Sequence, residues 1–262
     1  MQPRDVARLA SRYSADAEAY EELWVPEILP LGHRLADAMP ISDAELILDL
    51  GAGVGALLPH LQSAAPRAVT VAGDRAPGMI ARVDASFPRL VLDAMHLPIA
   101  DASVDAVVMS FMLFHTIDPL DTLREVRRII RDGGAVGVAT WGASRARAAV
   151  EAWTEELEAH GATEEDALAD HDRTDTTAKM IALLEAAGFS EVRTETVRSE
   201  HPVSLKEFVA LRTRIGSFSR RLRSLPSDVR ERCLARAIER VSSMDPGEFV
   251  DDVDAILSVA VA

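Results

Sequence analysis

Short apolar runs alternate with amphipathic stretches through the middle of the chain. Apolar runs of strand length occupy residues 46–50, 69–73, 90–92, 104–109 and 135–140. The stretches between them have apolar residues at helical spacing, over residues 56–64, 77–86 and 120–131, and Gly133-Gly134 is predicted to end the last helix. Strands that alternate with helices predict βαβ units and a parallel sheet covered by helices on both faces.

The two ends of the chain have different patterns. Two helices are predicted before the first strand, over residues 4–39, and further helical patterns cover residues 146–171, 177–187 and 204–243, with Pro226 starting the last helix. Residues 192–197 and 253–261 are strand-like. We therefore expect one α/β domain over residues 1–262, made of an N-terminal helical cap (1–40), a ligand-binding core (45–141) and helical insertions (142–175 and 204–243).

Composition narrows the class of protein. The chain has 262 residues, 42 acids against 28 bases and a net charge of −14, which argues against binding through nucleic-acid phosphates. No apolar run is long enough to span a bilayer, and the start lacks a signal-peptide core, so we expect a cytoplasmic protein that does not bind membranes. A single cysteine, Cys233, excludes an internal disulfide and a cysteine metal cluster, and we expect no metal.

Charge is unevenly placed along the chain. Residues 151–175 hold ten acids and one base, whereas residues 212–223 hold five arginines and no acid. Charge patterning favours solvated helix faces for both runs.

The most informative motif follows the first predicted strand. Asp49 lies inside that strand, and Gly51, Gly53 and Gly55 come after it at alternate positions. Glycines at a strand-to-helix turn let the backbone approach a ligand, and the helix start leaves N–H groups free for it. The spacing differs from the G-x-G-x-x-G dinucleotide fingerprint, and Asp49 would attract a cationic amino-acid group and repel a pyrophosphate. A tight turn without a ligand is the alternative.

Two further acids end the second and third predicted strands. Asp74 lies a little under twenty residues past the glycines, where an acid can bind both ribose hydroxyls, or can cap the helix that starts at Pro77. Asp93 can accept a hydrogen bond from an adenine amino group, with Met95 on the ring face and the Ala94 N–H on a ring nitrogen, or can belong to an ordinary strand-end turn. Ser110 and Phe111 end the fourth strand and would line the floor of the site.

These motifs, together with residues 93–119 and the sequence from Leu123 to Gly134, resemble the class I S-adenosylmethionine-dependent methyltransferases, in the small-molecule group that includes the ubiquinone and menaquinone biosynthesis enzymes. The resemblance covers residues 45–141. It implies a Rossmann-like doubly wound sheet, mostly parallel with an antiparallel last strand, and S-adenosylmethionine as the cofactor. The resemblance implies that Asp49, Gly51, Gly53 and Gly55 surround the methionine part, that Asp74 binds the ribose, and that Asp93 and Ala94 bind the adenine. The other expected cofactor-binding residues are Ala52, Arg75, Met79, Met95, Ser110 and Phe111.

The chain departs from the family pattern at Arg75, where a small apolar residue or Leu usually follows the acid. This arginine would either point to solvent or narrow the ribose pocket. No Asp/Asn-Pro-Pro-Tyr tetrapeptide follows the fourth strand, which argues against methylation of DNA bases. His115 is the best candidate for a catalytic base, because an ordinary histidine titrates near neutrality, but a structural hydrogen-bonding role is the alternative.

The expected reaction is methyl transfer to the oxygen or carbon of a small, largely apolar acceptor. The alternatives are a non-methylating reaction such as a cyclisation, or ligand binding without catalysis. Acceptor specificity is expected from residues outside the core, namely Tyr13, Tyr20, Trp24, Phe114 and Phe218, and these aromatic rings would otherwise only attach the helices to the sheet. A monomer and a homodimer are both compatible with the sequence.

Overall fold

The computed structural model describes residues 3–145, 147–162 and 171–262. The chain forms two compact units, the first made of residues 1–143, 168–197 and 254–262, and the second of residues 144–167 and 198–253. Four of the acids in the predicted acidic run lie outside the described residues, namely Glu164, Glu165, Asp166 and Asp170. No helix in the described ranges has the length and apolar character needed to cross a membrane.

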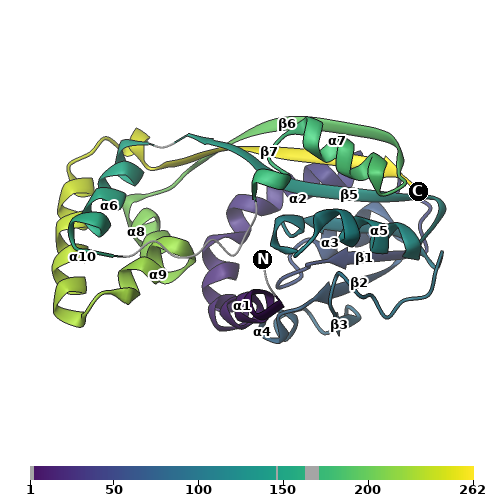
Figure 1. The fold of residues 1–262 in the computed structure, drawn as a ribbon, viewed down its shortest axis with the longest axis horizontal. Coiled ribbons are helices and arrows are strands. Elements are labelled where there is room, and N and C mark those ends of the chain that lie inside the picture. Colours follow the sequence, from purple (N-terminus) through teal and green to yellow (C-terminus); the bar gives the residue numbers. More distant parts are fainter. Residues whose placement is uncertain (1–2, 146, 163–170) are drawn as a thin grey trace. The chain divides into compact units, whose positions relative to one another are not determined.

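The first unit is built on a sheet whose described strands have the order β3-β2-β1-β4-β5-β7-β6 (Figure 1). The strands are β1 (Leu46–Leu50), β2 (Val69–Asp74), β3 (Arg89–Val91), β4 (Val104–Ser110), β5 (Ile130–Arg145), β6 (Ser190–Pro202) and β7 (Val250–Val261). Strands β1 to β5 pair in parallel, with Leu48 level with Val71 on one side and with Val107 on the other. Strand order reverses between β1 and β4, which is where open α/β sheets bind ligands.

Helices cover both faces of this sheet, which confirms the doubly wound α/β fold. On one face, α2 (Val25–Ala38) and α3 (Leu58–Ala64) pack Leu35 and Leu61 against Ile47 of β1. On the other, α5 (Pro119–Ile129) and α7 (Thr177–Ala186) pack Leu123 and Leu184 into the cluster that contains Leu48. Neighbouring β1 residues therefore point to opposite faces, as strand geometry requires.

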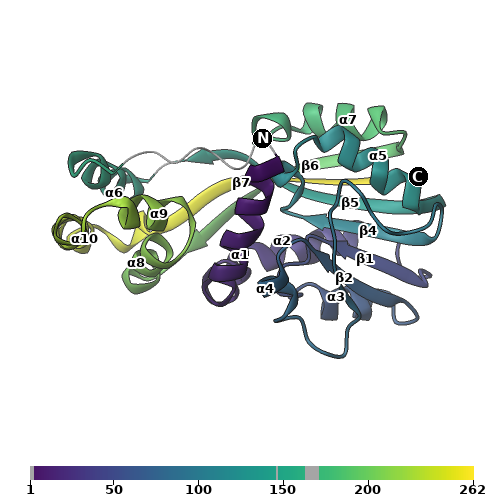
Figure 2. The same cartoon turned by 60° about the horizontal axis from the view of Figure 1, so that its bottom comes forward.

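The N-terminal helix α1 (Pro3–Leu23) lies beside the short helix α4 (Pro77–Ile80) (Figure 2). The Gly78 N–H donates to Ser14 Oγ at 3.1 Å. A Cβ on Gly78 would lie 2.5 Å from the Ser14 carbonyl oxygen, so only glycine allows this approach of the two backbones. Ala17 and Met79 are buried at the contact.

Strands β6 and β7 run antiparallel, as the resemblance implied for the end of the chain. The Gly133 N–H donates to the Ala262 carbonyl and the Ala262 N–H donates to Gly134, so the end of β7 meets the start of β5. Thr194 Oγ1 lies 3.1 Å from Ser258 Oγ between β6 and β7.

Two predicted helix boundaries are wrong. The helix expected over 77–86 ends at Ile80, because Asp84 then accepts from the Ser86 N–H and hydroxyl in a local turn. Helix α5 ends at Ile129, before the Gly133-Gly134 pair that was expected to stop it, and Ile130 is already extended at φ −78° and ψ 132°. Gly134 lies inside β5, where a Cβ would lie 2.5 Å from the Asp105 carbonyl oxygen.

The second unit contains α6 (Ala148–Ala159), α8 (Leu205–Arg214), α9 (Gly216–Ser224) and α10 (Ser227–Ser242), with Pro226 at the N-cap of α10. Trp153, Phe208 and Cys233 lie in its core, and Cys233 is only 1% exposed. Three short 3-10 segments complete the described elements: η1 (Leu113–His115), η2 (His171–Arg173) and η3 (Pro246–Glu248).

The interpretation of the charged runs as solvated faces is wrong for several of their members. Arg212 is 4% exposed, lies with its guanidinium carbon 3.8 Å from the centre of the Phe208 ring, and pairs with Asp251 at 2.9 Å. Arg221 is also buried, and Glu156 of the acidic run is buried beside Arg240 at 3.1 Å. Long charged side chains can pack inside the helical unit because their CH₂ groups are apolar and their charged ends form ion pairs.

Candidate functional site

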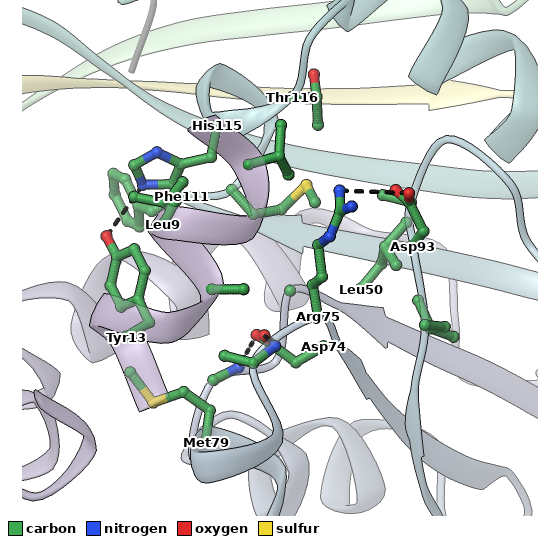
Figure 3. A pocket seen from close by; sticks show the side chains of 18 of the residues that line it. Leu9, Tyr13, Leu50, Asp74, Arg75, Met79, Asp93, Phe111, His115 and Thr116 are labelled. Atoms are coloured by element: carbon green, nitrogen blue, oxygen red, sulfur yellow. Dashed lines mark hydrogen bonds and ion pairs between the residues drawn. The ribbon is translucent and has the colours of Figure 1, made fainter. Parts of the chain in front are cut away.

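One pocket of the first unit collects most of the predicted site residues (Figure 3). It lies at the carboxyl ends of β1, β2 and β4, and its empty space, counted together with the open solvent at its mouth, is about 830 Å³. The predicted residues that line it are Tyr13, Tyr20, Gly51, Gly53, Asp74, Arg75, Met79, Asp93, Ala94, Met95, Ser110, Phe111 and His115. Residues from α1 to η1 therefore meet around one space.

The three motif glycines all adopt positive φ, at +79° for Gly51, +55° for Gly53 and +80° for Gly55. Their surroundings differ. A Cβ on Gly51 would lie 2.5 Å from Met112 Cβ, and one on Gly53 would lie 3.4 Å from Cε1 of the Tyr20 ring. Gly55 packs against Leu58 and Val83, away from the pocket lining, so its part in this turn is structural.

Asp74, at the end of β2, is hydrogen-bonded to the glycine loop. Its Oδ2 accepts from the Gly53 N–H at 2.9 Å, and its Oδ1 accepts from the Ala76 N–H at 2.8 Å. Burial raises the pKa of Asp74, and the backbone hydrogen bonds partly oppose that effect. The N-cap of α4 is Ala76, so Asp74 does not cap the helix at the position that the sequence alternative required.

Asp49 is a buried carboxylate behind the same loop. It is 2% exposed, and its Oδ2 has no hydrogen-bond partner among the described residues. Burial, followed by the charge of Asp74, raises its pKa to about 7. Asp49 and Ala52 line an adjoining smaller pocket, which shares Tyr20, Gly51 and Ser110 with the first.

Asp93 stands at the far side of the pocket, in an isolated bridge with His96 just after β3. Its Oδ1 accepts from the Met95 N–H at 3.1 Å, and its Oδ2 lies 3.3 Å from Arg75 Nη1 (Figure 3). Arg75 therefore lines the pocket and pairs with another lining residue, so the alternative in which Arg75 points only to solvent is wrong.

The end of β4 gives the pocket an aromatic wall. Phe111 has a left-handed backbone, with φ +56°, which is costly for a bulky residue. Its ring packs on Trp141 of β5, with centroids 4.1 Å apart. Strained backbones of this kind concentrate at ligand sites, where the surrounding structure holds them in place.

Helix α1 and η1 bring Tyr13 and His115 together. Tyr13 Oη lies 3.0 Å from His115 Nε2, and the two rings meet edge to face with centroids 5.5 Å apart. Tyr20 lies about two helical turns further along α1. Burial, with the nearby Tyr13, Asp74 and Asp49, raises its pKa above the usual range for a phenol. The Tyr13 hydroxyl thus faces a polar group of the pocket lining.

Three predicted acceptor residues do not line either pocket. Trp24 packs on Tyr20 with centroids 5.8 Å apart, Phe114 is buried against His115 and His171, and Phe218 belongs to the helical core of the second unit. The pocket also contains lining residues that the sequence analysis did not name, namely Val6, Leu9, Ala10, Leu50, Ala76, Leu92, Met112, Thr116 and Ile117. The helical spacing of Val6, Ala10 and Tyr13 was the available signal for the α1 members.

The residues around the pocket fit an amino-acid-bearing nucleoside. The Oδ2 of Asp49, which has no hydrogen-bond partner among the described residues, can accept from an ammonium group. Gly51 and Gly53 have no side chains, so a ligand can approach their backbone closely. Asp74 and Asp93 offer carboxylates at two further strand ends. Among the described residues, no group of three or more His, Cys, Asp or Glu side chains is arranged to hold a metal ion.

Residues 48–138 match the family described as a methyltransferase domain. A malonyl-[acyl-carrier protein] O-methyltransferase of Dechloromonas aromatica is 38% identical over 109 residues, which are 42% of this chain and 41% of that protein. A demethylmenaquinone methyltransferase of Mycolicibacterium vanbaalenii is 32% identical over 142 residues, or 52% of this chain and 60% of that protein. The chain thus spans about half the length of these curated relatives.

The fold also resembles a solved methyltransferase structure. Phosphoethanolamine N-methyltransferase 2 of Haemonchus contortus, solved with S-adenosyl-L-methionine, superposes with a TM-score of 0.57 at 15% identity, over 95% of this chain and 57% of that one. Sheet order, the glycine loop and the match of residues 48–138 agree with one another. Residues 48–138 are therefore similar in sequence to a methyltransferase domain, and the fold around them is similar to that of a solved methyltransferase.

Proposed function

We propose that the protein transfers the methyl group of S-adenosylmethionine to a small, largely apolar acceptor, by attack of an acceptor oxygen or carbon. The observation that carries the proposal is the convergence of Asp49, Asp74 and Asp93, from three successive strand ends, around one glycine loop. Two curated relatives with methyltransferase names support the reaction class.

Each end of the cofactor has a matching part of the site. Asp49 would receive the ammonium group of the methionine part beside Gly51 and Gly53, Asp74 would accept from the ribose hydroxyls, and Asp93 would accept from the adenine amino group. The cofactor supplies a methyl group on a positively charged sulfur, which is already activated for displacement. The protein's own contribution is then mainly to hold the acceptor close to that carbon and in line with it.

The acceptor would enter at the α1 side of the pocket. Val6, Leu9 and Ala10 make this wall apolar, and Tyr13 and His115 add the polar groups at its inner end. When the acceptor carries a hydroxyl, the His115 imidazole would take its proton, directly or through the Tyr13 hydroxyl. Tyr13 then acts as a positioning residue, because its hydrogen bond fixes the orientation of the imidazole.

A matched pair of glycine variants tests cofactor binding at the loop. Gly53→Val places a branched side chain against Tyr20 at φ +55°, whereas Gly133→Val meets a similar φ of +80° with no atom within 4 Å of its Cβ. Both variants should lose some stability. Calorimetry should show S-adenosylhomocysteine affinity lowered about tenfold or more, which is about 1.4 kcal/mol, in Gly53→Val alone. Equal affinity in the two folded variants would contradict the assignment.

Catalysis has its own test. Purified protein should release S-adenosylhomocysteine from S-adenosylmethionine when it is supplied with a panel of apolar phenols, enols and carboxylic acids, and mass spectrometry should find the acceptor heavier by one methyl group. Cofactor binding with a product that gains no methyl group would instead favour a non-methylating reaction.

A further inference from the structure

Arg75 and Asp93 form an ion pair within the lining of the main pocket (Figure 3). Arg75 follows Asp74 at the end of β2, and Asp93 follows β3, so the pair joins two neighbouring strand ends. Arg75 Nη1 lies 3.3 Å from Asp93 Oδ2, and the two side chains are 38% and 35% exposed. The guanidinium therefore lies at the nucleoside side of the pocket, where the family pattern has an apolar residue.

Both oxygens of Asp93 have donors within reach. Oδ1 accepts from the Met95 N–H at 3.1 Å, and Oδ2 faces Arg75. The Met95 donor is backbone and is fixed by the turn after β3, whereas the Arg75 donor is on a long and partly exposed side chain. A ligand group that donates to Asp93 must therefore share or displace the arginine at Oδ2.

We propose that Arg75 determines the affinity and base specificity of the nucleoside site, by competing with the ligand for Asp93. This inference rests on the proposed function, in which an adenine amino group donates to Asp93. Binding exchanges the ion pair for that hydrogen bond, and the half-exposed arginine turns toward solvent. The exchange is feasible because a partly exposed pair is only weakly stabilising.

The competition also affects which base is accepted. An adenine amino group donates a hydrogen bond to Asp93, so a nucleoside with adenine binds more tightly when Arg75 no longer occupies that carboxylate. A 6-oxo purine offers an acceptor oxygen instead, which the Asp93 carboxylate repels and the Arg75 guanidinium can satisfy. Arg75 therefore lowers the affinity for a nucleoside with adenine but not for one with a 6-oxo purine. Removing Arg75 should increase the ratio of these two affinities in favour of adenine.

Calorimetry with S-adenosylhomocysteine and S-inosylhomocysteine tests the proposal on the full chain. The variant is Arg75→Leu, and the control is Arg124→Leu, which makes the same charge change at an exposed pair, Arg124–Asp121 at 3.0 Å, outside the pocket lining. We expect Arg75→Leu to bind S-adenosylhomocysteine about two- to fivefold more tightly, the range set by one partly exposed ion pair. Its ratio of adenine to hypoxanthine affinity should rise, and Arg124→Leu should match the wild type in both.

Salt and a second variant separate competition from other effects. Raising salt screens the ion pair, so wild-type affinity for S-adenosylhomocysteine should rise with salt, and Arg75→Leu affinity should respond less. In an Asp93→Asn background, Arg75→Leu should give no gain. If the wild type binds S-adenosylhomocysteine and Arg75→Leu binds it equally or less tightly, the inference is overturned. If the wild type binds neither nucleoside at any salt, the proposed function itself fails.

Discussion

Tyr13 Oη lies 3.0 Å from His115 Nε2, although 102 positions separate the two residues in the chain. The hydrogen bond joins helix α1 to the segment after β4, and both residues line the main pocket. A phenol and an imidazole in contact offer two exchangeable protons at one place. The α1 wall of the pocket and the candidate base are therefore joined by the same contact.

Removing either partner should slow the reaction more than it weakens cofactor binding. His115→Gln loses the proton acceptor, so kcat should fall about a hundredfold or more for a hydroxyl acceptor, whereas Tyr13→Phe should have a smaller effect and should shift the pH profile of kcat. S-adenosylhomocysteine affinity, measured by calorimetry, should stay close to that of the wild type in both.

His60→Gln is the control, because His60 also pairs through its ring, with Asp37 at 2.7 Å, but does not line either pocket. A His115→Gln enzyme with wild-type kcat at every pH would leave the histidine a structural role only.

The left-handed backbone of Phe111 predicts a difference between two truncations. Phe111→Ala and Phe111→Gly both remove the ring and its contact with Trp141, but only glycine adopts φ +56° without strain. Phe111→Gly should therefore be about 1 kcal/mol more stable than Phe111→Ala in urea denaturation. Both should lose activity equally, because the aromatic wall is gone in each. The opposite order of stability would show that the backbone at this position is not strained.

Most of the fold follows from periodicity along the chain. The buried strand of residues 46–50 and the helix expected over residues 120–131 were predictable because each pattern reflects burial on a known face. The helix after Pro77 was predicted too long, since the turn that follows it depends on a hydrogen bond from the Ser86 N–H to the Asp84 side chain. The length of β5 was missed because its outer residues pair with strands from far along the chain.

The site was predictable where it lies at strand ends. Asp74, Asp93 and Gly53 could be placed near one another because parallel strands end at one edge of a sheet. The Arg75–Asp93 pair and the contact of Tyr13 with His115 depend on side-chain directions and helix docking, which spacing does not report. Trp24 and Phe114 shared the aromatic character of the lining residues, but they pack beside the pocket.

The raised pKa of Asp49 predicts a dependence of stability on pH. Its pKa moves from 3.8 to about 7 in the folded protein, so folding binds this proton more tightly. The contribution to stability is full below pH 4 and is lost as the pH rises toward 7, at up to about 1.4 kcal/mol per pH unit. Urea denaturation between pH 5 and pH 8 should show the free energy of unfolding of the wild type falling relative to Asp49→Asn, with no further change above the pKa.

Parallel pH profiles of the wild type and Asp49→Asn would mean that Asp49 is ionised throughout this range.

Asp74 should affect stability and binding together. Asp74→Ala leaves the Gly53 and Ala76 N–H groups without their acceptor, so we expect a loss of about 1–3 kcal/mol in the free energy of unfolding and weaker S-adenosylhomocysteine binding. Asp74→Asn keeps one acceptor oxygen and should recover more stability than affinity. Asp84→Ala, which breaks a similar turn at Ser86 away from the pocket, should lower stability without changing the affinity. Unchanged affinity in Asp74→Ala would reduce Asp74 to a loop anchor.

The burial of Cys233 has a practical consequence for labelling. This thiol is the only one in the chain, it is 1% exposed, and burial raises its pKa, so little reactive thiolate forms near neutral pH. Maleimide and iodoacetamide reagents should therefore not label the folded wild-type protein. A cysteine introduced on the exposed surface of α1 or α10 would then be the sole attachment point for a fluorophore or spin label, without first replacing the native residue.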